Sequence, residues 1–330
     1  MQRRFTTRRT TDAKVGAMDL TRRGFLAAAL AIGLAGCVPM PNPRLDVPTP
    51  TGGRPPIWQK AADAETAIAT AYTAAASVIT GGADWCKGAA ALHAAHAATM
   101  SLANPWSGLG LGTPVTSAGA TDAKTALSQL ERAISDATTT ITAGLKQAAN
   151  GPEALLWASL LVCLQVGSVW CADTTVKRPA PKPGTVVPYE ITVDPVADAA
   201  TAALDRCYAL RFALTTSLGR TARNGQLHAD LANALTQVGT MVASLMGLLM
   251  ASGATPPAPE LSYTLPSGLG DNDAIRATWG AMEASLGQAC TYLAGCLTGD
   301  DAVTWATTAG DQMARATAMG QTLTWWPGWG

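Results

Sequence analysis

The sequence has few of the groups that carry catalysis or charge-driven binding. Its 330 residues include three histidines and three phenylalanines, and the 23 basic side chains are balanced by 23 acidic ones. A net charge of zero argues against a nucleic-acid partner, because binding to phosphates needs a basic surface. The chain also lacks the Gly-x-Ser-x-Gly, Gly-x-x-x-x-Gly-Lys and Gly-x-Gly-x-x-Gly motifs. The chain therefore carries none of the standard sequence signatures of hydrolases, phosphate-loop proteins or dinucleotide-binding proteins.

Alanine is abundant, with 65 copies, whereas aromatic residues make up only 5% of the chain. Alanine loses no side-chain entropy when it enters a helix, so this composition favours helices over a β-sandwich. The length is sufficient for two domains of ordinary size. The composition therefore predicts an all-α protein.

Positive charge is concentrated at the N-terminus. Residues 1–36 carry seven basic side chains against two acidic ones, which leaves 16 basic and 21 acidic residues in the rest of the chain. The basic stretch ends at Arg22 and Arg23, and the apolar run 27–35 follows. This order is typical of a signal peptide, and about ten apolar residues are too few to cross a membrane, which takes roughly 20. The sequence predicts export.

Two details refine the predicted signal. Arg22-Arg23 followed by Gly-Phe-Leu resembles a twin-arginine export signal. The run Leu34-Ala35-Gly36-Cys37 resembles the lipobox of bacterial lipoproteins, in which the cysteine thiol receives lipid. Two or more acyl chains on Cys37 would anchor the protein to the outer face of the cell membrane. The alternative is a plain secretory signal with an incidental Arg pair and cysteine, and either Met1 or Met18 can be the start.

Proline-rich stretches divide the remaining chain. Residues 37–57 are predicted to be a tether, and residues 174–194 a linker between two helical parts, 58–173 and 195–330. Each part contains four stretches with helical character. The predicted helices are 59–80, 84–102, 122–149, 152–172, 195–218, 221–252, 272–298 and 300–323.

The two parts align with each other, which indicates an internal duplication. Short matches occur in the same order in corresponding helices, although alanine-rich helices also align by accident. The matched positions are Ala62–Glu65 with Ala197–Ala200, His96 with Gln237, Leu130-Glu131 with Met282-Glu283, and Trp157 with Trp305. Helices of this length, joined by alternating short and long loops, are typical of helix bundles.

The second part resembles a ferritin-like domain of unknown function found in exported actinobacterial proteins. The residues that carry the resemblance are Ala251–Pro257, Tyr263–Pro266, Glu283 and Trp326–Gly328. The first part is more loosely similar to the N-terminal bundle that accompanies such domains. The resemblance implies two ferritin-like four-helix bundles in tandem and leaves the biochemical role open.

Most ligands of a ferritin-like di-iron site are missing. Such a site needs Glu-x-x-His on two helices, and the chain contains no Glu-x-x-His. Glu283 alone cannot hold a metal ion and is interpreted as a residual ligand position. His93 and His96 share one helical face, and Glu131 is the carboxylate expected to approach them. The three residues predict, as an alternative to no cofactor, a single Zn²⁺ or Fe²⁺ ion; otherwise one histidine points to solvent and the other is a core residue.

Six cysteines remain when Cys37 is set aside. An even number in an exported chain favours disulfides, although buried free thiols are the alternative. Their spacing does not select a pairing, because six cysteines allow fifteen connectivities. The cysteines are Cys86, Cys163, Cys171, Cys207, Cys290 and Cys296.

These observations predict a lipid-anchored protein of the cell envelope; they favour a non-enzymatic role and leave an enzymatic one open. Its first interpretation is a binding or structural module for an unidentified ligand or an envelope protein partner. The alternatives are a metal-binding or oxidoreductase protein with a reduced site in the first bundle, and a carrier of an apolar small molecule.

Overall fold

The computed structural model describes residues 54–107, 112, 115–117 and 119–329. Residues Thr51–Gly330 form one compact unit. The predicted signal with Arg22 and Arg23, the predicted lipid-bearing Cys37 and the tether up to residue 53 lie outside the described residues.

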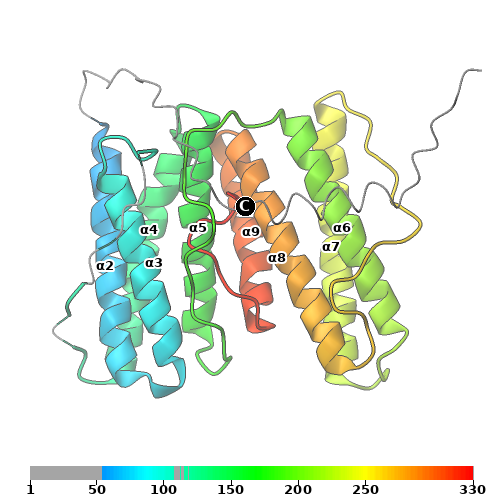
Figure 1. Ribbon diagram of the computed structural model, residues 1–330, viewed down its shortest axis with the longest axis horizontal. Coiled ribbons are helices and arrows are strands. Elements are labelled where there is room, and N and C mark those ends of the chain that lie inside the picture. Colours follow the sequence, from blue (N-terminus) through cyan, green and yellow to red (C-terminus); the bar gives the residue numbers. More distant parts are fainter. Residues whose placement is uncertain (1–53, 108–111, 113–114, 118, 330) are drawn as a thin grey trace, which may run out of the picture. The chain divides into compact units, whose positions relative to one another are not determined.

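Eight α-helices make up the described part, and no β-strand occurs in it, which confirms the all-α prediction (Figure 1). A short 3-10 turn, η1 (Thr80–Gly82), precedes the second of them. The helices are α2 (Pro56–Val78), α3 (Ala83–Ser101), α4 (Ala123–Lys146), α5 (Gly151–Ala172), α6 (Val196–Leu218), α7 (Gln226–Ala251), α8 (Asn272–Cys296) and α9 (Gly299–Ala318).

Two helices, α5 and α7, are long and apolar enough to cross a membrane by length and composition. In α5 the most apolar window is 83% buried inside the protein, so this helix is explained as the central core helix that its all-round apolar surface predicts. In α7 the corresponding window is only 33% buried. The large apolar side chains of α7, such as Leu231, Leu245 and Leu249, are nevertheless buried, so α7 packs as an amphipathic helix with one exposed face.

The helices pack in the same pattern in both halves of the chain. In the first half α2 packs on α3 and α4, and α4 packs on α5. In the second half α6 packs on α7 and α8, and α8 packs on α9. The halves meet where α5 packs on both α8 and α9 (Figure 1). This repeated pattern supports the predicted duplication, although one hydrophobic core runs through both halves.

The N-terminal caps of the third helix in each half give a different register for aligning the two halves. Asp122 caps α4 by accepting from the Thr125 backbone N–H, and Asp271 caps α8 in the same way at Ala274. Counted from these caps, the buried Glu283 matches the buried Ile134, not Glu131. This register differs by three residues from the predicted match of Glu283 with Glu131, which is exposed.

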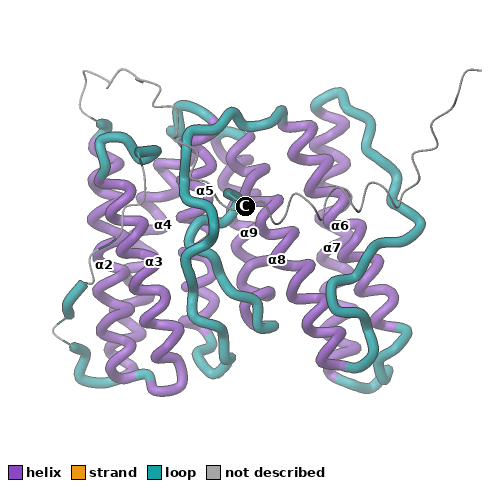
Figure 2. Tube along the Cα trace, in the orientation of Figure 1, coloured by secondary structure: helices purple, strands orange, loops and turns teal. Residues whose placement is uncertain are grey.

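A C-terminal segment, residues 321–329, lies beside the linker between the halves (Figure 2). Lys182 and Thr324 form a single parallel β-bridge, with backbone hydrogen bonds from Lys182 to Leu323 and from Trp325 to Lys182. Trp326 and Trp329 are buried at 4% and 6% exposure. Their rings pack into the protein rather than forming an exposed aromatic patch.

The six cysteines of the described residues are free thiols, so the predicted disulfides are not found and the alternative of free thiols holds. All are buried except Cys296, which is half-buried. Burial raises the pKa of Cys86, Cys171, Cys290 and Cys296 to about 12. These thiols are packed as small apolar groups.

Candidate metal centre

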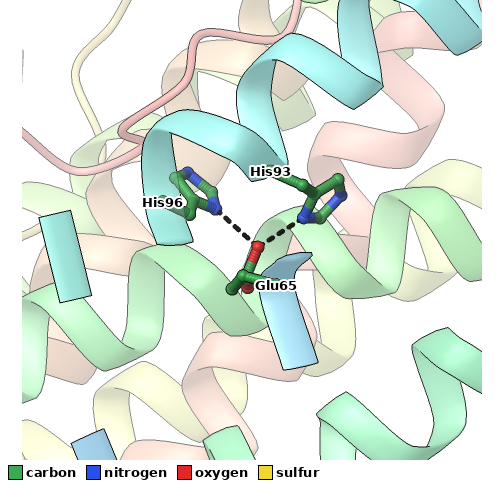
Figure 3. Close-up of side chains that lie close together, drawn as sticks. All are labelled: Glu65, His93 and His96. Carbon is green, nitrogen blue, oxygen red and sulfur yellow. Dashed lines mark hydrogen bonds and ion pairs between the residues drawn. The ribbon is translucent and has the colours of Figure 1, made fainter. Parts of the chain in front are cut away.

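Three ionisable side chains meet inside the first half of the protein. Glu65 comes from α2, and His93 and His96 come from α3 (Figure 3). The Oε2 atom of Glu65 lies 2.6 Å from Nδ1 of His93 and 3.3 Å from Nδ1 of His96. One ligand atom from each residue falls within 4.8 Å of the other two. Two imidazoles and one carboxylate are a donor set that binds Zn²⁺ or Fe²⁺.

Local sequence explains why the three side chains converge. Residues three apart lie on the same face of a helix, so His93 and His96 both point toward α2. On α2 the buried positions Ala61, Glu65, Ile68 and Tyr72 recur at helical spacing and place Glu65 on the face that packs against α3. The intervening alanines, as at Ala61, allow the two helix backbones to approach closely.

The cluster is closed off from solvent. Glu65 and His96 are fully buried, and His93 is 2% exposed. The ring of Tyr72 stacks on His93 with centroids 5.5 Å apart, and the ring of Trp326 lies 4.4 Å from His96. The aromatic side chains therefore fix the orientation of both imidazoles.

The second nitrogen of His96 is already engaged. Its Nε2 atom lies 2.7 Å from the backbone oxygen of Trp325, and because a carbonyl only accepts, Nε2 carries the proton. In a neutral ring Nδ1 then has a lone pair that faces the Glu65 oxygen at 3.3 Å. Two acceptors that face each other repel, and a metal ion or a proton between them would remove that repulsion. Hydrogen bonding of the outer nitrogen to a carbonyl is the arrangement typical of metal-ligating histidines.

The charges of the cluster suit a cation. Burial alone would raise the pKa of Glu65, but the two imidazoles and their hydrogen bonds outweigh it and hold the pKa at about 2. Burial lowers the pKa of His93, more than the carboxylate raises it. At neutral pH the site therefore presents a carboxylate and a neutral His93 ring, which are the protonation states that metals bind. The Oε1 atom of Glu65 has no hydrogen-bond partner among the described residues.

The structure confirms that His93 and His96 lie together and corrects the carboxylate. Glu131 is exposed on α4, so its prediction as a ligand is wrong, and Glu65 takes that place. The missed signal was the buried-face spacing of α2, on which Glu65 is the one acidic member between Ala61 and Tyr72.

Glu283, predicted as a residual ligand position, is buried at 1% exposure without a histidine beside it. Its Oε1 accepts from Trp279 Nε1 at 2.8 Å and pairs with Arg315 Nε at 3.4 Å. Burial raises the pKa of Glu283, although the guanidinium partly offsets this. In the described part of the second half this carboxylate serves a hydrogen-bonded ion pair.

Comparison of the chain with known protein families, characterised proteins and solved structures finds no match.

Proposed function

We propose that this protein binds one divalent transition-metal ion, Zn²⁺ or Fe²⁺, through Glu65, His93 and His96. The observation that carries the proposal is the pair of Nδ1 atoms on one carboxylate oxygen, with the outer nitrogen of His96 held by the Trp325 carbonyl. That carbonyl fixes the tautomer that leaves Nδ1 free to coordinate.

One separation between ligand atoms fits a tetrahedral ion, and a second must widen. With metal–ligand distances of about 2.1 Å, ligand atoms of a tetrahedral site lie about 3.4 Å apart. Glu65 Oε2 and His96 Nδ1 are 3.3 Å apart, close to this separation. Glu65 Oε2 and His93 Nδ1 are 2.6 Å apart and must separate by about 0.8 Å. Coordination through Nδ1 would also require the one proton of the neutral His93 ring to move from Nδ1, where it is donated to Glu65, to Nε2.

We further propose that the site works in an exported lipoprotein. The predicted signal with Arg22-Arg23 and the predicted lipid on Cys37 would hold the folded part at the outer face of the cell membrane. A twin-arginine signal fits folding before export. Because the three ligands are closed off from solvent, an ion enclosed during folding in the cytoplasm would be carried across with the protein. The ferritin-like resemblance agrees with a metal held inside a helical bundle.

The competing account is a metal-free cluster in which His96 carries a second proton and pairs with Glu65. Titration with Co²⁺ separates the two accounts, because a cobalt ion bound by nitrogen and oxygen ligands absorbs visible light. We expect one Co²⁺ per chain, displaced by Zn²⁺, with affinity reduced by at least about tenfold in His96→Ala. The control is His228→Ala, because His228 lies on α7, is hydrogen-bonded to Thr221 and is not one of the three ligands. No visible band in the wild-type protein, or an unchanged titration in His96→Ala, would exclude the metal site.

A further inference from the structure

The seam between the second and fourth helices differs between the two halves. In the first half this seam, between α3 and α5, is closed by the C-terminal segment. The Trp325 carbonyl accepts from His96 on α3 at 2.7 Å and from the Cys163 thiol on α5 at 3.9 Å. In the second half the same seam, between α7 and α9, holds a groove of about 610 Å³.

The groove lies at the position that the C-terminal segment fills in the other half. Helices α5 and α9 begin at Gly151 and Gly299, and in this register the buried Trp157 matches the buried Trp305. Cys163, which contacts the segment, then matches Asp311, which lines the groove. The helices of the second half thus present an equivalent seam with nothing from the described residues in it.

The floor of the groove is apolar. Met241 and Leu248 of α7 face Trp305 of α9, and Met241 and Trp305 are each 8% exposed. The small side chain of Ser244 and the bare backbone of Gly247 give the groove its width on the α7 side. A groove of this size with an apolar floor is suited to an aromatic side chain.

One buried acceptor of the groove lacks a donor. Gln312 is 2% exposed, lines the groove, and its Oε1 has no hydrogen-bond partner among the described residues. Asp301 and Asp311 add two carboxylates, whereas the lining contains one cation, Arg315, which already pairs with Glu283. The groove is therefore negative and rich in acceptors. Asp311 already accepts from Gln165 at 2.9 Å, so an apolar small molecule would fill the floor and leave the buried Gln312 Oε1 unpaired.

We propose that the α7–α9 groove binds an extended segment of a partner protein that carries a tryptophan beside a basic residue. The tryptophan would occupy the apolar floor, much as the buried Trp326 packs on His96 of α3, and a backbone N–H of the segment would pair with Gln312 Oε1. The basic side chain would complement Asp301 at the rim, which gives the negative groove its choice of partner.

The test uses the full chain and a dye-labelled peptide, Lys-Thr-Trp-Trp-Pro-Gly, which repeats the sequence of Thr324–Gly328 with a lysine added. Fluorescence anisotropy should show saturable binding with a Kd below about 100 μM. A Cβ on Gly247 meets no atom within 4 Å, so Gly247→Leu projects into the groove without a clash and should weaken binding at least about tenfold. Gly239→Leu on the same helix, equally free of clashes and outside the groove, is the control.

The charge of the peptide gives a second arm. Replacing its lysine by glutamate should weaken binding severalfold, with the difference shrinking at high salt. Absence of saturable binding, or equal affinity of Gly247→Leu and Gly239→Leu, overturns the proposal. Indole binding as tightly as the peptide would assign a small-molecule site instead. A wild-type dimer that Gly247→Leu dissociates would assign the groove to a second copy; both results contradict a partner segment.

Discussion

His96 on α3 donates a hydrogen bond from Nε2 to the backbone carbonyl of Trp325, 229 residues further along the chain, at 2.7 Å. The candidate metal centre in the first half is therefore completed by the last residues of the second half. The contact lies next to the buried Trp326, whose ring packs on His96, so it couples the orientation of His96 to the packing of Trp326.

Substitution of Trp326 by Ala should destabilise the protein and disturb the metal centre together. Trp326 is 4% exposed, so removing its ring should lower the free energy of unfolding by about 3–5 kcal/mol. Trp325→Ala should cost less, because its side chain is half-buried and its carbonyl stays in place. Urea unfolding followed by circular dichroism measures the loss of stability in both variants. Equal losses in the two variants would contradict this account of the segment.

Acidification should weaken the metal-free protein. The pKa of His93 is lowered by burial, so below about pH 6.5 the unfolded chain binds a proton that the folded chain lacks, and the free energy of unfolding falls. Glu65 affects stability at lower pH. Its pKa of about 2 lies below the ordinary 4.5, so the stability that its carboxylate contributes is lost as the pH falls from 4.5 toward 2.

The measurement is urea unfolding in chelator at about pH 7.5, 5.5 and 3.5. Glu65→Gln should flatten the dependence in the lowest interval. Glu283 has the opposite sign, because burial raises its pKa, so Glu283→Gln should steepen the loss in acid. A Glu283→Gln protein that becomes more stable as the pH falls from 7.5 to 5.5 would contradict the lowered pKa of His93.

Substitution by alanine should change the stability of the protein in opposite directions at two helical glycines. A Cβ on Gly167 of α5 would lie 2.6 Å from the Tyr72 hydroxyl, so Gly167→Ala must push the ring that stacks on His93 and should cost about 1–3 kcal/mol. A Cβ on the exposed Gly239 meets nothing, and Gly239→Ala should stabilise by about 0.5–1 kcal/mol. Thermal unfolding of the two variants tests the packing around Tyr72.

The cysteines should behave as buried thiols. In a Cys37→Ser variant, a thiol reagent should label the native protein slowly and label six cysteines after unfolding. Cys296 should react first, because it is the one half-buried thiol among the six. A mass lower by two hydrogens, with fewer than six labelled thiols after unfolding without reductant, would show that a disulfide forms and that this part of the account is wrong.

The helices were predictable because their signals are local. The stripe of α4, with Leu130, Ile134 and Ile141 buried, follows directly from the helical period, and the all-round apolar surface of α5 correctly predicts a core helix. The disulfide prediction failed because it followed from the predicted compartment, whereas the side-chain packing that leaves the thiols free depends on tertiary structure.

Two of the three candidate ligands could be predicted. The pairing of His93 and His96 is a property of one helix, but the choice of carboxylate depends on which face of α2 or α4 turns inward. Identity with Glu283 favoured Glu131, while the caps Asp122 and Asp271 set a register in which Glu131 is outside. The contact of His96 with Trp325 joins residues that are 229 positions apart, so no local pattern in the sequence predicts it.

Metal analysis of the purified protein tests the central claim most directly. Protein prepared without chelator, and refolded with Zn²⁺ or Fe²⁺ if needed, should contain one transition-metal ion per chain. Glu65→Gln should lose that ion, because it replaces a ligand. Glu283→Gln should retain it and is the matched control, because it removes the same charge from another buried carboxylate. A wild-type protein that holds no more metal than Glu65→Gln under both conditions would contradict the assignment of Glu65, His93 and His96 as a metal centre.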